Sequence, residues 1–166
     1  MKTAVCSGSF DPITLGHLDI IRRAAQCFDR VYVCVSPNAE KKNQRFTPEQ
    51  KLRLVQAAVA ELPNVEAELW PGLLADYAVA RRAVIVRGVR NTTDYDVEDQ
   101  LARINAGIHP GLETLLLPAS AAYQHFSSSM IREMIRFHQP LEKYLPMSIL
   151  PLLKDMTEKK EGNING

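Results

Sequence analysis

The sequence lacks the patterns of a secreted, metal-binding or membrane-spanning protein. Its cysteines, Cys6, Cys27 and Cys34, are odd in number and form no C-x-x-C pair, which argues against a disulfide framework or a zinc site. No apolar run is long enough to span a bilayer, and the N-terminal residues do not have the layout of a signal peptide. The formal net charge of +1 gives no global attraction to nucleic acid or anionic lipid. We therefore expect a cytoplasmic protein that binds neither nucleic acid nor membranes and captures any anion through local groups.

The G-x-G-x-x-G fingerprint of dinucleotide-binding proteins is also absent, which counts against NAD or FAD as a cofactor. The chain of 166 residues has no internal repeat and no linker-like stretch. This length suits one domain with a sizeable core. We expect that domain over residues 1–157, followed by a frayed polar tail over residues 158–166.

Short apolar runs alternate with amphipathic segments along the chain. The run VYVCV at 31–35 is apolar on both faces, which is typical of a parallel sheet covered by helices on both sides. The spacing predicts an α/β domain with a doubly wound, five-stranded parallel sheet and right-handed crossovers. The expected strands are 3–6, 31–35, 65–69, 83–86 and 113–117. The expected helices are about 18–28, 48–62, 73–82, 93–108, one that begins after Ser127, and 146–156, the last being broken or begun at Pro151.

Apolar spacing also predicts which helical residues are buried. In the helix over 93–108 the stripe of Val97, Leu101, Ile104 and Ile108 is expected to face inward. Glu98, as a glutamate in a helix, is expected to face water. After Ser127 the expected core residues are Met130, Met134 and Phe137.

The stretch SGSFDPITLGH at 7–17 connects the first predicted strand to the first predicted helix. A turn of small residues at a helix start exposes backbone N–H groups and the positive end of the helix dipole, which together favour an anion. Gly16 and His17 add an imidazole at the same place. The alternative is that the turn only connects two elements and His17 has no role, so the turn alone is weak evidence.

Three later segments carry candidate anion ligands. Lys41 and Lys42 lie in a polar loop after the second strand and would otherwise be interpreted as a solvated surface pair. Arg87 and Arg90 follow a buried strand and offer planar guanidinium groups that match phosphate oxygens. The serines at 127–129 begin a helix; capping explains one hydroxyl but not three. Since the carboxyl ends of parallel strands share one edge, we expect the turn at 8–17, the segment 87–90 and the segment 127–132 to converge in one crevice.

The motifs G-S-F-D-P-I-T-L-G-H at 8–17, the K-K loop, R-G-V-R followed by D-Y-x-x-E, and S-S-S-M-I-R occur in this order at family-like spacing. Together they resemble the phosphopantetheine adenylyltransferase family of the T-x-G-H nucleotidylyltransferases, from the first residues to about Pro146. The resemblance implies a Rossmann-like nucleotidylyltransferase fold. It also implies transfer of the adenylyl group of ATP to 4′-phosphopantetheine, with Mg²⁺ accompanying the ATP and no metal ligand expected from the protein, and a homohexamer.

The resemblance also implies roles for individual residues. His17 would stabilise the transition state at the α-phosphate, and Lys41, Leu74, Arg87 and the Ser9 hydroxyl would bind the phosphopantetheine substrate. The implied ATP-binding residues are Ser9, Phe10, His17, Gly88, Val89, Arg90, Glu98, Tyr123, Gln124, His125, Phe126, Ser127, Ser128 and Ser129.

Two alternatives remain open at this point. A transferase of the same superfamily with another nucleotide or phosphorylated acceptor would share the motifs at 8–17 and 127–132. The Lys41 loop and the segment 87–90 favour phosphopantetheine. A nucleotide-binding sensor without chemistry is the second alternative, and the intact set of donors argues against it.

Overall fold

Five parallel strands form one sheet in the order β3-β2-β1-β4-β5. The computed structural model describes residues 1–37 and 44–162, with side chains described as far as residue 158. The strands are β1 (Thr3–Gly8), β2 (Arg30–Val35), β3 (Val65–Leu69), β4 (Ala83–Val89) and β5 (Thr114–Pro118). The predicted five-stranded parallel sheet is confirmed.

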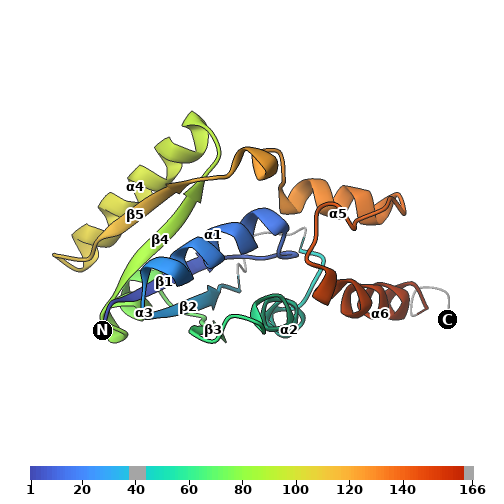
Figure 1. The fold of residues 1–166 in the computed structure, drawn as a ribbon, viewed down its shortest axis with the longest axis horizontal. Coiled ribbons are helices and arrows are strands. Elements are labelled where there is room, and N and C mark those ends of the chain that lie inside the picture. Colours follow the sequence, from blue (N-terminus) through green and yellow to red (C-terminus); the bar gives the residue numbers. More distant parts are fainter. Residues whose placement is uncertain (38–43, 163–166) are drawn as a thin grey trace.

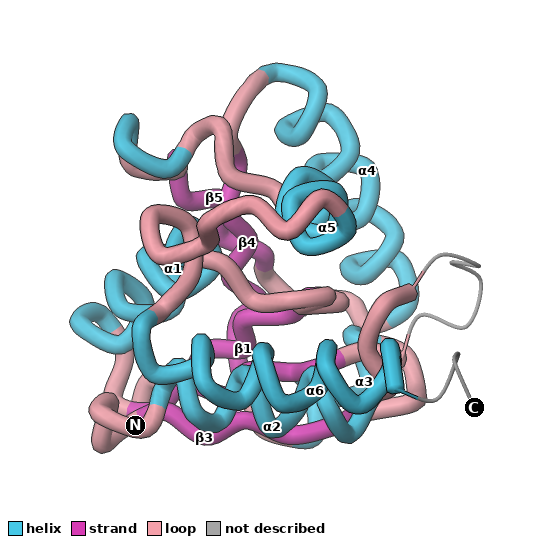
Figure 2. Tube along the Cα trace, turned by 90° about the vertical axis from the view of Figure 1, so that its right-hand side faces the viewer, coloured by secondary structure: helices cyan, strands magenta, loops and turns pink. Residues whose placement is uncertain are grey.

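Helices cover both faces of this sheet (Figures 1 and 2). They are α1 (Leu15–Cys27), α2 (Pro48–Val59), α3 (Leu74–Ala80), α4 (Thr92–Ile108), α5 (Ser128–Arg136) and α6 (Leu150–Gly162), with short 3₁₀ turns at Ala121–Tyr123 and Met147–Ile149. Figure 1 shows α4 with β4 and β5 at one end of the molecule and α5 and α6 at the other. None of the helices in the described ranges has the length and apolar character needed to cross a bilayer.

The two faces of β1 show how the layers are built. Ala4 and Cys6 pack into the larger core, which holds the buried residues of α1, α2, α5 and α6. Val5 points to the opposite face and packs into a smaller core with Tyr77 and Ala78 of α3. Because successive strand residues point to opposite faces, a strand that is apolar throughout needs a helical layer on each side. The doubly wound arrangement is therefore confirmed.

The strand order reverses at the centre of the sheet. β1 pairs with β2 on one side and with β4 on the other. The chain leaves the carboxyl ends of β1 and β4 in opposite directions, and this topological switch point opens a crevice where α/β proteins bind ligands. β1 continues to Gly8 and β4 to Val89, so both strands extend beyond their predicted ends. The strands themselves therefore carry Gly8, Arg87 and Gly88 to the edge of the crevice.

The prediction for α4 is wrong. Val97, Leu101, Ile104 and Ile108 are 52%, 42%, 57% and 42% exposed, whereas Glu98 is the buried residue of this helix. Helical periodicity identifies an apolar face, but it does not tell whether that face covers the chain's own sheet or another surface. The apolar stripe is present on α4, and it lies on the outside of the chain.

Two further expectations differ near the C-terminal end. Phe137 is 58% exposed, because α5 ends at Arg136 and the chain turns away from the stripe formed by Ile131 and Ile135; Met130 and Met134 are partly buried against the core, as predicted. The final helix begins at Leu150, after a 3₁₀ turn, and continues to Gly162 instead of ending at 156. Part of the segment predicted as a tail is therefore helical.

Candidate active site

A pocket of about 620 Å³ lies at the carboxyl ends of β1 and β4, where α1 and α5 begin. Its volume is typical of a small-molecule site. Segments near residues 9, 88 and 127 meet there, so the predicted convergence on one edge is confirmed. The predicted site residues that line it are Ser9, Phe10, His17, Arg87, Gly88, Arg90, Glu98, Tyr123, Phe126, Ser127, Ser128 and Ser129.

Other predicted residues are not brought to this pocket. Leu74, at the start of α3, and Val89, Gln124 and His125 do not line it. Lys41 and its neighbour Lys42 lie outside the described residues.

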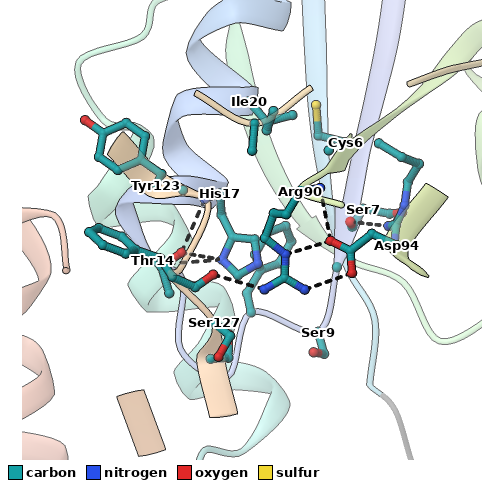
Figure 3. Close-up of a pocket in the computed structure, with 18 of the residues that line it drawn as sticks. Cys6, Ser7, Ser9, Thr14, His17, Ile20, Arg90, Asp94, Tyr123 and Ser127 are labelled. Carbon is teal, nitrogen blue, oxygen red and sulfur yellow. Dashed lines mark hydrogen bonds and ion pairs between the residues drawn. The ribbon is translucent and has the colours of Figure 1, made fainter. Parts of the chain in front are cut away.

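The start of α1 fixes the orientation of His17. Thr14 is the N-cap, and its side chain accepts from the His17 backbone N–H at 3.3 Å. In return, the Thr14 backbone N–H donates to Nδ1 of His17 at 3.1 Å (Figure 3). An imidazole nitrogen that accepts from a backbone N–H carries no proton of its own, so the proton of the neutral ring is on Nε2. The capping box thereby makes Nε2 a donor.

The surroundings of His17 keep the imidazole neutral. Burial is the main cause, and repulsion from Arg87 and Arg90 adds to it; together they lower the pKa of His17 to about 4. The positive end of the α1 dipole acts in the same direction. At neutral pH the pocket therefore contains an oriented, uncharged N–H donor instead of an imidazolium.

Phe10 supports the same ring from the turn after β1. Its φ of +43° lies in the left-handed region that non-glycine residues rarely adopt, and its side chain is 3% exposed. The aromatic ring meets the His17 imidazole edge to face at a centroid distance of 5.2 Å. It also covers Gly8, where a Cβ would lie 3.0 Å from the ring. The tight turn thus holds the imidazole on one side while Thr14 holds it on the other.

Arg87 lies on β4 with its guanidinium beside β1. Nε and Nη2 donate to the two carboxylate oxygens of Glu98 at 2.8 and 2.7 Å, which is a bidentate ion pair. Nη1 donates to the Ser7 carbonyl oxygen and, at 2.6 Å, to the Ser7 Oγ. Arg87 and Glu98, which the motif resemblance assigns to different substrates, are thus bonded to each other.

Arg90 forms a second pair of the same kind just beyond β4. Nε and Nη2 donate to the carboxylate of Asp94 at 2.7 and 3.0 Å, and Nη1 donates to the Phe126 carbonyl oxygen at 3.2 Å (Figure 3). The side-chain hydrogen bond from Arg90 is the main cause that lowers the pKa of Asp94 below its usual value. Arg90 therefore connects α4 to the loop that precedes α5.

The three serines at the start of α5 have three separate partners. Ser127 is the N-cap and accepts from the Met130 N–H at 3.1 Å. Ser128 donates to the Pro12 carbonyl oxygen at 2.8 Å, and Ser129 accepts from Arg132 at 3.0 Å. Capping explains only the first hydroxyl, and the other two join α5 to the turn after β1 and to a cation.

Several residues that line the pocket lie inside the predicted anion-binding segments but were not predicted as ligands. Arg132 donates to the Asp11 carbonyl oxygen at 3.0 Å and lies 3.6 Å from its carboxylate. The buried Asp11 carboxylate also accepts the backbone N–H groups of Arg45 and Phe46 at 3.0 and 2.9 Å. Asp11 belongs to the F-D-P motif and Arg132 to the S-M-I-R motif, so membership in these motifs was the signal that could have identified them. Ser7 and Asp94 also belong to the motif stretches. Ser7 bonds to Arg87, which is distant in sequence, and the bond between Asp94 and Arg90 becomes evident only in the fold.

The charges in the pocket are balanced. Among the described lining residues, the arginines at 87, 90 and 132 each have a carboxylate partner, at 98, 94 and 11 respectively. Within the described ranges no group of three or more His, Cys, Asp or Glu side chains is placed to hold a metal ion. The pocket therefore offers oriented donors of both charged and neutral type for an anionic ligand.

Comparison with known proteins finds relatives over nearly the whole chain. The family model described as cytidylyltransferase-like matches residues 5–134. The chain is 38% identical over 165 residues to a phosphopantetheine adenylyltransferase of Rubrobacter xylanophilus, covering 99% of this chain and 100% of that protein. It is 39% identical over 153 residues to the protein of the same name from Staphylococcus carnosus, covering 92% and 94%.

Two more comparisons agree with these matches. The phosphopantetheine adenylyltransferase of Levilactobacillus brevis is 38% identical over 164 residues, covering 98% of this chain and 99% of that protein. A solved structure from Vibrio parahaemolyticus, assigned as a nicotinate-nucleotide adenylyltransferase, superimposes with a TM-score of 0.68 at 21% identity, covering 93% of both chains. This structural likeness supports the fold.

Proposed function

The chain belongs to the phosphopantetheine adenylyltransferase family, and we propose that the pocket between β1 and β4 is where it transfers the adenylyl group of ATP. An enzyme of this family joins that group to 4′-phosphopantetheine in coenzyme A biosynthesis. The products are dephospho-coenzyme A and pyrophosphate.

His17 is the proposed catalytic residue. The attacking phosphate of 4′-phosphopantetheine is already an anion, so the reaction needs no strong base and no protein nucleophile. What the enzyme supplies is alignment of two polyanions and stabilisation of the charge that develops on the α-phosphate. The Nε2–H of His17, oriented by Thr14 and uncharged at neutral pH, is suited to donate to an α-phosphate oxygen in that state.

The remaining proposed contacts follow the motif resemblance, and only those residues that line the pocket are also supported by their placement. Arg87 would bind the phosphate of 4′-phosphopantetheine, assisted by Ser9, Lys41 and Leu74. The nucleotide would contact Ser9, Phe10, Gly88, Val89, Arg90, Glu98 and the segment 123–129. The start of α5, with its free backbone N–H groups and the Ser128 and Ser129 hydroxyls, is a suitable place for the triphosphate.

Mg²⁺ would enter as part of the nucleotide substrate. The carboxylates that line the described pocket already accept from arginine or backbone groups, so they are not arranged as a metal site. Because each arginine that lines the described pocket is paired with a carboxylate, the described lining residues leave the negative charge of a triphosphate largely uncompensated. A magnesium ion on the phosphates would supply that compensation and polarise them.

The observation that carries the proposal is the meeting of His17, Arg87 and the serines of α5 in one pocket. The test measures pyrophosphate release with ATP or CTP against a panel of phosphorylated acceptors, and identifies the product by mass. We expect turnover with ATP and 4′-phosphopantetheine to exceed every other pair. Preference for another acceptor or for CTP would indicate a different transferase of the superfamily, and ATP binding without turnover would indicate a sensor.

We further propose that the chain assembles through the exposed stripe of α4, as expected for the predicted homohexamer. Val97, Leu101, Ile104 and Ile108 form a continuous apolar face, which a lone subunit would expose to water. Light scattering should give a mass of several subunits. Ile104→Glu should lower that mass, whereas Ala106→Glu, on another face of α4, should not. A cytoplasmic location remains a prediction from the sequence.

A further inference from the structure

Helix α4 presents two carboxylates to the pocket one turn apart. Asp94 and Glu98 each form a bidentate pair with one arginine from the end of β4, and those arginines are three residues apart. The pairing is ordered along the helix: the first carboxylate holds the second arginine, and the second carboxylate holds the first. Figure 3 shows the Arg90 and Asp94 pair beside the His17 imidazole.

The donors of Arg87 show what this pairing leaves for a ligand. A guanidinium has five N–H groups. Glu98 accepts one from Nε and one from Nη2, and Ser7 accepts the two of Nη1 through its carbonyl and hydroxyl oxygens. Only the second N–H of Nη2 is left by these four bonds. Arg87 is therefore held in one orientation, with a single defined edge available to a phosphate oxygen.

The same arrangement engages both oxygens of Glu98. Both carboxylate oxygens accept from Arg87, and the residue is 9% exposed, although it is on a helix whose apolar residues face water. Each oxygen of this carboxylate accepts one bond from Arg87, and a direct approach to a triphosphate would bring two negative charges together. The geometry therefore favours an action of Glu98 through Arg87.

Arg90 is held differently. Its guanidinium lies between Asp94 and the Phe126 carbonyl oxygen, on the side of the pocket where α5 begins. Arg87 is instead held against β1 by Ser7. Without its carboxylate, each arginine would keep only the bonds of Nη1, to Ser7 or to the Phe126 carbonyl oxygen, and its long cationic side chain would sample more rotamers.

We propose that Glu98 and Asp94 are positioning residues, which act through Arg87 and Arg90 and keep these two arginines assigned to different substrates. The inference rests on the proposed function. It assigns Arg87, held by Glu98, to the phosphorylated acceptor, and Arg90, held by Asp94, to the nucleotide. Glu98 thus affects acceptor binding, and not ATP binding as the motif resemblance implies.

The test is a pair of double-mutant cycles in the full-length enzyme, with KM and kcat measured for both substrates. Glu98→Gln should raise KM for 4′-phosphopantetheine by about tenfold, the range seen for coupled charged neighbours, and leave KM for ATP within about twofold. In an Arg87→Ala background, the same substitution should add no further change. Asp94→Asn is the matched control: it should raise KM for ATP, and this effect should vanish in an Arg90→Ala background.

The possible outcomes distinguish a failure of the proposed function from a failure of the role assigned to Glu98. A wild-type enzyme without turnover of 4′-phosphopantetheine and ATP refutes the proposed function and this inference with it. An active wild type in which Glu98→Gln raises KM for ATP, equally in both backgrounds, overturns only the role given to Glu98.

Folding is checked by thermal denaturation. If Glu98→Gln does not fold, Glu98→Asp replaces it, since the shorter side chain keeps the charge but cannot reach both Nε and Nη2 of Arg87. A folded Glu98→Asp enzyme with an unchanged KM for 4′-phosphopantetheine also overturns the inference.

Discussion

Two substitutions at His17 separate the role of its two ring nitrogens. Asparagine places an oxygen near the position of Nδ1 and can keep the bond from the Thr14 backbone N–H, which is 3.1 Å long in the wild type. It has no atom where Nε2 stands. Glutamine reaches further: its Oε1 can accept from the Thr14 N–H, as Gln50 accepts from Thr47 in α2, and its amide group can supply an N–H toward the pocket. We therefore expect both variants to preserve the helix cap, and His17→Asn to lose far more of the catalysis than His17→Gln.

The magnitudes follow from what each variant loses. Removing a preorganised donor from a developing oxyanion costs about 3–4 kcal/mol in the barrier, which corresponds to a hundredfold to several hundredfold loss of kcat for His17→Asn. His17→Gln keeps a donor on a more mobile side chain, so a loss of about tenfold is expected. Both variants keep an acceptor for the Thr14 N–H, so the free energy of unfolding of each should stay within about 1 kcal/mol of the wild-type value.

Saturating pyrophosphate-release assays give kcat, and thermal or denaturant unfolding at pH 7 gives stability. The Thr14→Ala variant serves as a control, because it weakens the cap while leaving both ring nitrogens in place. If folded His17→Asn turned over as fast as His17→Gln, Nε2 would not be the group that stabilises the transition state. If Thr14→Ala were as stable as the wild type, the Thr14 side-chain contact would not support α1.

Three further predictions follow from the structure. Because the pKa of His17 is lowered from 6.5 to about 4, the unfolded chain binds a proton in this range that the folded chain does not, so stability present above pH 6.5 is lost as the pH falls toward 4. Unfolding curves at pH 7 and pH 5 should therefore differ less for His17→Gln than for wild type. Gly88→Ala would place a Cβ 2.7 Å from Cγ1 of Ile20 and should cost about 1–3 kcal/mol in unfolding free energy, part of which Ile20→Ala should restore. Calorimetry should show Arg87→Ala weakening 4′-phosphopantetheine more than ATP; an equal loss for both would contradict the assignment of that arginine.

Local signals in the sequence predicted much of the fold. The T-P-E-Q segment predicts a capped helix, and Thr47 and Gln50 do form a capping box with Pro48 in the first turn of α2. Ser127 caps α5 as its position before an amphipathic run suggests. Apolar runs on both strand faces predict the layers. These signals depend on residues a few positions apart, so they can be identified from the sequence without the fold.

The partners of the charged residues could not be predicted in this way. Nothing near Glu98 in the sequence shows that it lies under Arg87, because that contact depends on how α4 packs against β4. The outward stripe with Ile104 was misplaced for a related reason: the apolar pattern is the same whether the covering surface belongs to the same chain or to another. The burial of Glu98 and the exposure of the α4 stripe both depend on contacts between residues that are distant in sequence.

The balanced charges of the pocket have a consequence for selectivity. Each described arginine at its surface already has an internal counterion, so a small solitary anion such as chloride or free phosphate gains little by entering and must break an existing pair to gain more. A ligand with several phosphates and an attached organic body can offset that cost through many contacts at once. The resting enzyme can thus remain receptive to its large substrates in a solution crowded with simple salts.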